Sequence, residues 1–126
     1  VQLYFHFCSE RFCVEILTRK IGKFVKERDW EQFHSPKNIA ISISLESSEL
    51  LEIFQWSRGL SWSEFENDRL KSRAEEELSD ILIYLIRFAD LAGINLEKSA
   101  IEKIEKNKKK YPIEKFKGSD KKYDDL

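Results

Sequence analysis

The sequence is poor in the residues that make turns and cross-links. Its 126 residues include only four glycines, two prolines and two cysteines. An all-β chain needs frequent turns, so this scarcity favours long helices instead. Cys8 and Cys13 are too few for a disulfide framework or a zinc site. We therefore expect reduced thiols and a cytoplasmic protein.

The sequence also lacks methionine, any long apolar run and a substantial net charge. No apolar stretch reaches membrane-spanning length, and residues 1–13 lack the basic start of a signal peptide. We expect residues 1–13 to be a variable or foreign extension of a single domain that covers residues 1–126. A net charge of −1 provides no basic field, so we expect neither a nucleic-acid partner nor a membrane partner.

What remains is a helical pattern, which predicts an all-α fold. Apolar residues recur at helical spacing in four segments, predicted as helices over residues 14–28, 36–56, 68–92 and 96–109. Ser35-Pro36, Gly93 and Asn95 are residue types favoured at helix ends. Residues 29–34 and 57–68 are predicted to be connections, and residues 113–126 an extended C-terminal tail.

The second predicted helix is ambiguous at its start. Residues 39–45 alternate apolar and small side chains, which is typical of a strand, but the residues that follow have helical spacing and no turn residue intervenes. As a helix, this segment places Ile39, Ile43, Glu46 and Leu50 on one stripe. The helical interpretation therefore puts the carboxylate of Glu46 inside an apolar stripe, where a surface glutamate is not expected.

Two acidic motifs, Glu46-x-x-Glu49 and Glu77-x-x-Asp80, are the main functional signal. A spacing of three puts both carboxylates of a motif on one helical face, and carboxylates that face a helical interior need a cation. An oxygen-only ligand set favours Mg²⁺, with Mn²⁺ as a substitute. Exposed residues in surface ion pairs are the alternative. A di-iron centre would require Glu-x-x-His motifs, which the sequence lacks.

Aromatic residues and lysines provide candidate substrate contacts. Trp30, His34, Trp56 and Tyr84 could wall a flat cleft beside the metal, although core packing is the alternative for each aromatic residue. Lysines near helix ends could reach phosphate oxygens; as an alternative, lysines at a helix C-terminus are solvated cations that complement the helix dipole.

Four sequence runs carry a family resemblance: ERDWEQFHSPKNIA (27–40), LESSELLEIFQW (45–56), EELSDILIYLIRFAD (76–90) and KNKKKYP (106–112). They resemble the all-α nucleoside triphosphate pyrophosphatases of the MazG-like superfamily, and in particular the dCTP pyrophosphatase-like branch. The resemblance covers roughly residues 20–126. It implies a four-helix MazG-like bundle that forms a homo-oligomer, either a dimer or a tetramer built as a dimer of dimers.

The resemblance also implies a set of site residues. The family's metal signature falls on Glu46, Glu49, Glu77 and Asp80, with Glu46 as the expected catalytic residue that orients or deprotonates a water. The expected substrate-binding residues are Trp30, Glu31, Gln32, Phe33, His34, Lys37, Trp56, Tyr84, Asn107, Lys110 and Tyr111.

The implied reaction is Mg²⁺-dependent hydrolysis of a (d)NTP, dCTP or a modified dCTP, to (d)NMP and pyrophosphate in nucleotide housecleaning. The sequence departs from the branch at three places. Ile21 replaces a histidine found in some members, Leu91 replaces an arginine, and Ser47 and Ser48 occupy a place where the family often has glycine. A non-catalytic helical module that binds nucleotide or metal and oligomerises is the alternative function.

Overall fold

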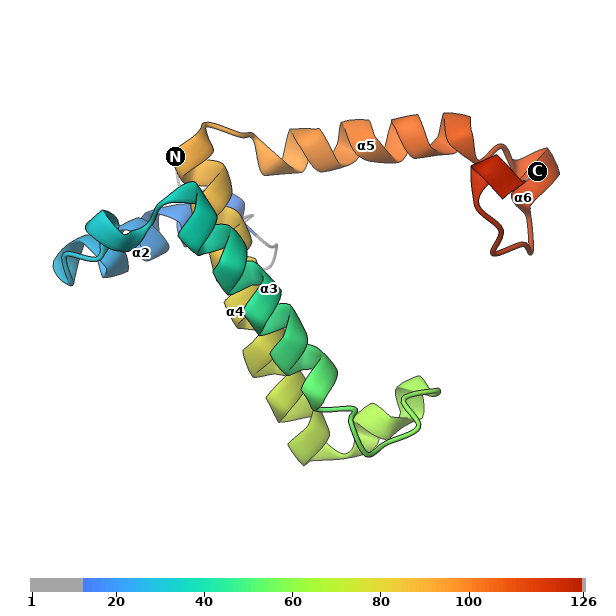
Figure 1. The fold of residues 1–126 in the computed structure, drawn as a ribbon, viewed down its shortest axis with the longest axis horizontal. Helices are drawn as coiled ribbons and strands as arrows, with labels where there is room; N and C mark the ends of the chain where they lie inside the picture. Colours follow the sequence, from blue (N-terminus) through green and yellow to red (C-terminus); the bar gives the residue numbers. More distant parts are fainter. Residues whose placement is uncertain (1–12, 126) are drawn as a thin grey trace, which may run out of the picture. The chain divides into compact units, whose positions relative to one another are not determined.

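A computed structural model describes residues 13–125, and every regular element in that range is helical, which confirms the predicted all-α class. Four helices are long and correspond to the four predicted ones (Figure 1). The α-helices are α2 (Val14–Glu27), α3 (Pro36–Glu52), α4 (Asp68–Ala92), α5 (Leu96–Lys110) and α6 (Ile113–Phe116), and the short 3-10 helices are η1 (Glu31–Phe33), η2 (Trp62–Glu66) and η3 (Tyr123–Asp125).

The strand-like start of α3 is helical, as predicted. The Oγ atom of Ser35 accepts a hydrogen bond from the backbone N–H of Asn38 (3.2 Å), and Pro36 occupies the first turn. The end of α3 was predicted wrongly: the helix stops at Glu52 and not at Trp56. Tight turns replace the predicted last turn of this helix, and the ring of Phe54 lies against that of Phe65 of η2 (5.8 Å between ring centroids). A contact within the connection therefore outweighs the helical spacing of the sequence.

Helix α2 ends in a Schellman motif. The backbone N–H of Trp30 donates to the carbonyl of Val25, and that of Asp29 to the carbonyl of Lys26. Asp29 has a φ of 53°, a left-handed conformation that aspartate tolerates better than most residues. The connection after α2 is therefore a defined turn that aims Trp30 back toward the helix.

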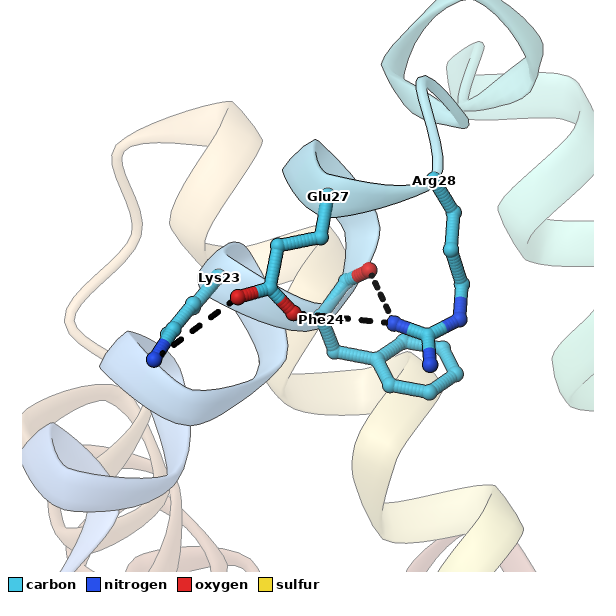
Figure 2. A network of polar contacts seen from close by, with 4 residues as sticks. All are labelled: Lys23, Phe24, Glu27 and Arg28. Atoms are coloured by element: carbon cyan, nitrogen blue, oxygen red, sulfur yellow. Dashed lines mark hydrogen bonds and ion pairs between the residues drawn. The ribbon is translucent and has the colours of Figure 1, made fainter.

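The last turn of α2 is held by the side chain of Arg28 (Figure 2). Its guanidinium lies over the ring of Phe24 (3.8 Å to the centroid) and donates to the Phe24 carbonyl (3.0 Å). Glu27 lies between Arg28 (3.8 Å) and Lys23 (3.7 Å). The ring of Phe24 in turn meets that of Trp30 edge to face, 5.6 Å between centroids. This network fixes both rings.

Helices α2, α3 and α4 pack together within residues 13–93. Helices α3 and α4 run antiparallel and side by side, and α2 packs against α4 (Figure 1). Ile21 and Val25 of α2 are buried with Ile86 of α4. The predicted stripe of α3 faces inward: Ile39 is buried, and Glu46 is half-buried. The packing of α3 on α4 is what brings the two acidic motifs together.

Residues 94–125 form a second compact unit. Asn95 caps α5 as predicted, since its Oδ1 accepts from the backbone N–H of Lys98 (3.0 Å). The predicted tail is not wholly extended, because it contains α6 and η3. The ring of Tyr111 holds it by edge-on contacts with Phe116 (5.0 Å) and Tyr123 (5.9 Å). None of the helices in residues 13–125 has the length and apolar character of a membrane crossing.

Candidate active site

An acidic cluster lies where α3 and α4 face each other. Glu46 of α3 and Glu77 and Asp80 of α4 each place one carboxylate oxygen within 4.8 Å of the others. The spacing of three puts Glu77 and Asp80 on one face of α4, and the apolar stripe of α3 carries Glu46 toward them. The fourth predicted carboxylate, Glu49, also interacts with Glu46 and Glu77. The structure thus brings all four predicted metal ligands together.

The electrostatics of this cluster are unfavourable without a cation. The pKa of Glu46 rises to about 7, first because of its hydrogen bond with Glu49, then because of burial and the neighbouring charges. The pKa of Glu77 is also raised, first by burial and then by the charge of Glu49. The Oε2 atom of Glu46 is buried and has no hydrogen-bond partner. A buried unpartnered carboxylate oxygen in such a cluster is suited to a metal ion.

The donor set decides which metal fits. Among residues 13–125, the cluster offers carboxylate oxygens alone, and neither histidine nor cysteine joins it. Hard divalent cations prefer such oxygen ligands, with Mg²⁺ and Mn²⁺ ahead of Zn²⁺. The chain's own residues therefore fit the predicted cation.

A cavity of about 380 Å³ adjoins the acidic cluster, and Asp80 belongs to the walls of both. Helices α2 and α4 and the connection after α2 form it. Its walls are mostly apolar and aromatic, as expected for a small-molecule site. The lining residues are Leu17, Lys20, Ile21, Phe24, Val25, Trp30, His34, Asp80, Ile83, Tyr84 and Arg87.

A second cavity of about 340 Å³ shares Trp30, His34 and Tyr84 with the first. Phe33 and the start of α3 complete it, with the polar side chains of Asn38 and Ser42. The amide of Asn38 donates to the Phe33 carbonyl (2.8 Å) and so ties η1 to α3. Predicted residues from the connection and from α4 therefore converge on two adjoining cavities.

Arg87 is a cavity residue that the sequence analysis missed. It is only 4% exposed, and its Nε donates to Nδ1 of His34 (3.1 Å). A signal was present in the sequence: Arg87 interrupts the apolar stretch of α4 and lies one and two turns beyond Tyr84 and Asp80 on one stripe. Leu91, one turn further, is 52% exposed and lines neither cavity.

Other predicted contacts lie outside these cavities. The amide of Gln32 donates to Asp29 (3.0 Å to the carbonyl). The carbonyl of Glu31 accepts from the backbone N–H of His34 (3.1 Å), and the Glu31 carboxylate acts on His34 through its charge. Lys37 is exposed at the start of α3. Trp56 is 92% exposed in the turn after α3. Asn107, Lys110 and Tyr111 belong to the second unit, where Lys110 lies over the ring of Tyr123 (4.9 Å); their place in the site stays a prediction.

An all-α fold with paired acidic motifs on packed helices is typical of one class of protein. Comparison with known proteins identifies the family within that class. The model of the MazG-like family matches residues 41–126. This match covers more than half of the chain, so the chain belongs to the MazG-like family, as predicted.

Relatives narrow the class further. The chain is similar to dCTP pyrophosphatase 1 of Bos taurus, with 39% identity over 127 residues that cover 97% of this chain and 72% of the relative. The Homo sapiens protein of that name is 36% identical over 90% of this chain and 67% of its own length. A pyrophosphatase from Archaeoglobus fulgidus matches with a TM-score of 0.72 and 46% identity, over 82% of this chain and 95% of that one. The prediction of a nucleotide pyrophosphatase is confirmed at this level.

Proposed function

We propose that the protein hydrolyses dCTP or a modified dCTP to the monophosphate and pyrophosphate with Mg²⁺, and so clears unwanted nucleotides from the cytoplasmic pool. The dCTP pyrophosphatases among its relatives support the substrate. One observation supports the chemistry above all: Asp80 belongs to both the acidic cluster and the aromatic cavity. A nucleotide with its base in the cavity would therefore extend its phosphates toward the cluster.

Different residues of the site are proposed to bind the nucleobase and to carry out the hydrolysis. The rings of Trp30 and Tyr84 offer flat faces to a nucleobase, and His34 offers a ring nitrogen. Glu46, Glu49, Glu77 and Asp80 would hold the cation, which supplies charge neutralisation at the phosphates and a bound water of lowered pKa. Glu46, which lies among the other three carboxylates, would orient or deprotonate the attacking water.

The direct test is an assay with Mg²⁺ and a panel of natural and modified dNTPs, with products separated by ion exchange. We expect dCMP and pyrophosphate from dCTP, and Mn²⁺ to substitute for Mg²⁺. Release of a diphosphate and inorganic phosphate would place the cleaved bond elsewhere. Binding of dCTP without turnover would instead indicate the non-catalytic nucleotide-binding module.

We also propose that the protein acts as a homo-oligomer, a dimer or a tetramer. Ile41 and Leu45 lie one turn apart on α3 and are 48% and 59% exposed, on the side away from buried Ile39. Apolar side chains exposed at helical spacing mark a surface that a second copy can cover. A second copy is the partner that the family resemblance implies.

A further inference from the structure

Arg87 is the only buried polar side chain among residues 13–125. A buried guanidinium loses its hydration, which is costly unless partners replace the lost water. Two partners are present. The Nε atom donates to Nδ1 of His34 (3.1 Å), and a terminal nitrogen lies 3.5 Å from a carboxylate oxygen of Asp90, one turn along α4. The guanidinium is therefore fixed between two side chains.

This arrangement determines the state of the histidine ring. A guanidinium carries no acceptor and keeps its protons in proteins, so Nδ1 of His34 has to be the unprotonated nitrogen that accepts. In a neutral ring the proton then resides on Nε2. The pKa of His34 is lowered, first by burial and then by the charge of Arg87, against the opposing charge of Glu31. The neutral ring is thus favoured near neutral pH.

The Arg87–His34 pair lies in the walls of the cavities that are proposed to hold the ligand. His34 lines both cavities, and Arg87 lines the larger one together with Trp30 and Tyr84. With Nδ1 occupied, Nε2–H is the group of the ring that remains for a ligand. It can donate to a carbonyl oxygen or an unprotonated ring nitrogen of a base, and it cannot accept from an amino group.

We propose that Arg87 is a positioning residue that fixes His34 as the Nε2–H tautomer, so that the ring presents a single donor to the nucleobase. The nucleobase as ligand rests on the proposed function. The tautomer and its cause rest on the Arg87–His34 contact alone. Arg87 thereby selects bases with an acceptor at this position and disfavours those with a donor there.

The test is nuclear magnetic resonance of the full ¹⁵N-labelled chain at about pH 8, above the ordinary pKa of histidine. The sequence has two histidines, so a His6→Gln background assigns the His34 signals. We expect one tautomer with the proton on Nε2, and a scalar coupling across the hydrogen bond from Arg87 Nε to His34 Nδ1. A proton on Nδ1, or no coupling, would overturn the proposal whatever the protein hydrolyses.

Variants of Arg87 test whether the contact with His34 affects substrate binding. In Arg87→Met we expect the coupling to vanish, both tautomers to appear, and KM for dCTP to rise roughly fivefold, as for one lost hydrogen bond, with a smaller change in kcat. The control is Arg73→Met, an exposed arginine on the same helix, which should leave all three readouts unchanged. Arg87→Lys, which keeps a charged donor, should recover part of the KM loss. Unchanged KM in a folded Arg87→Met protein would also overturn the proposal. If dCTP is not a substrate, the tautomer of His34 in the wild-type protein still tests the role of Arg87.

Discussion

At the scale of single residues, Glu46 shows how packing and chemistry conflict in this protein. Its place on the α3 stripe between Ile43 and Leu50 buries part of a carboxylate that water would otherwise solvate. The hydrogen bond with Glu49, then burial and the neighbouring charges, raise the pKa of Glu46 to about 7. The folded chain without a cation is therefore destabilised at this point, and a bound cation would relieve the repulsion.

The first prediction concerns pH and follows from that shift. Between about pH 4.5 and 7 the folded protein holds a proton on Glu46 that the unfolded chain has lost, so the stability of the metal-free protein falls as pH rises through this window. Thermal unfolding in EDTA should give a lower Tm at about pH 8 than at about pH 5.5, and Glu46→Gln should reduce the difference. Mg²⁺ should raise Tm more at the higher pH. An equal Tm gain from Mg²⁺ at both pH values would contradict this account.

The second prediction separates Glu46 from other glutamates of α3. Glu46→Gln keeps the shape of the side chain and removes its charge, so we expect kcat for dCTP to fall by about a hundredfold or more. Glu52→Gln, at the exposed end of the same helix, is the matched control and should stay within about twofold of wild type, as an exposed residue outside the cluster should. Equal activities of the two variants would show that Glu46 has no role in the reaction.

At the scale of elements, α4 contributes most to the site. Asp80, Tyr84 and Arg87 follow one another at helical spacing along one stripe. Under the proposed function, this stripe would supply a ligand for the cation, a ring for the base and a group that positions His34. The helix needs a sharp end after this stripe. Gly93 provides it with a φ of 67°, and its backbone N–H donates to the carbonyls of Ala89 and Asp90.

The third prediction uses two glycines with opposite roles. Gly93→Ala should lower the free energy of unfolding by about 1 kcal/mol, because an L side chain is strained in the left-handed region. Gly22→Ala, inside α2 with nothing within 4 Å of the new Cβ, should raise it by roughly 0.5–1 kcal/mol, because alanine favours the helix. Urea unfolding curves measure both. Two changes of the same sign would contradict the assignment of these roles.

At the scale of the whole molecule, the exposed apolar residues need an explanation that a single copy does not supply. The buried core of residues 13–93 is small, and α3 exposes Ile41 and Leu45 on its outer side. A chain of this size gains stability when a second copy covers such a surface. The exposed apolar surface thus supports the proposed oligomer, which the family resemblance also implies.

The fourth prediction tests that surface. Leu45→Lys should lower the molar mass measured by light scattering after gel filtration, because an ammonium group is costly to bury in an apolar contact. Ala40→Lys, at an exposed position roughly 100° from Ile41 and roughly 140° from Leu45 around the helix, adds the same charge outside the Ile41–Leu45 face and should keep the wild-type mass. A monomeric wild-type protein at micromolar concentration would rule out the proposed oligomer.

The sequence by itself determined the all-α class, most helix ends and the four carboxylates. These depend on local rules: apolar spacing, caps such as Ser35 and Asn95, and paired acidic residues on one helical face. The family resemblance added the kind of reaction and the aromatic connection after α2.

Only the tertiary structure decided which of those residues meet. The packing of α3 on α4 joins Glu46 to Glu77 and Asp80, and the turn at Asp29 brings Trp30 and His34 to the face of α4 that carries Arg87. Trp56 lies beyond the end of α3 because Phe54 packs on Phe65. Helical spacing in the sequence does not encode that contact. The pairing of Arg87 with His34 is a contact between residues 53 positions apart, and it depends on packing in three dimensions.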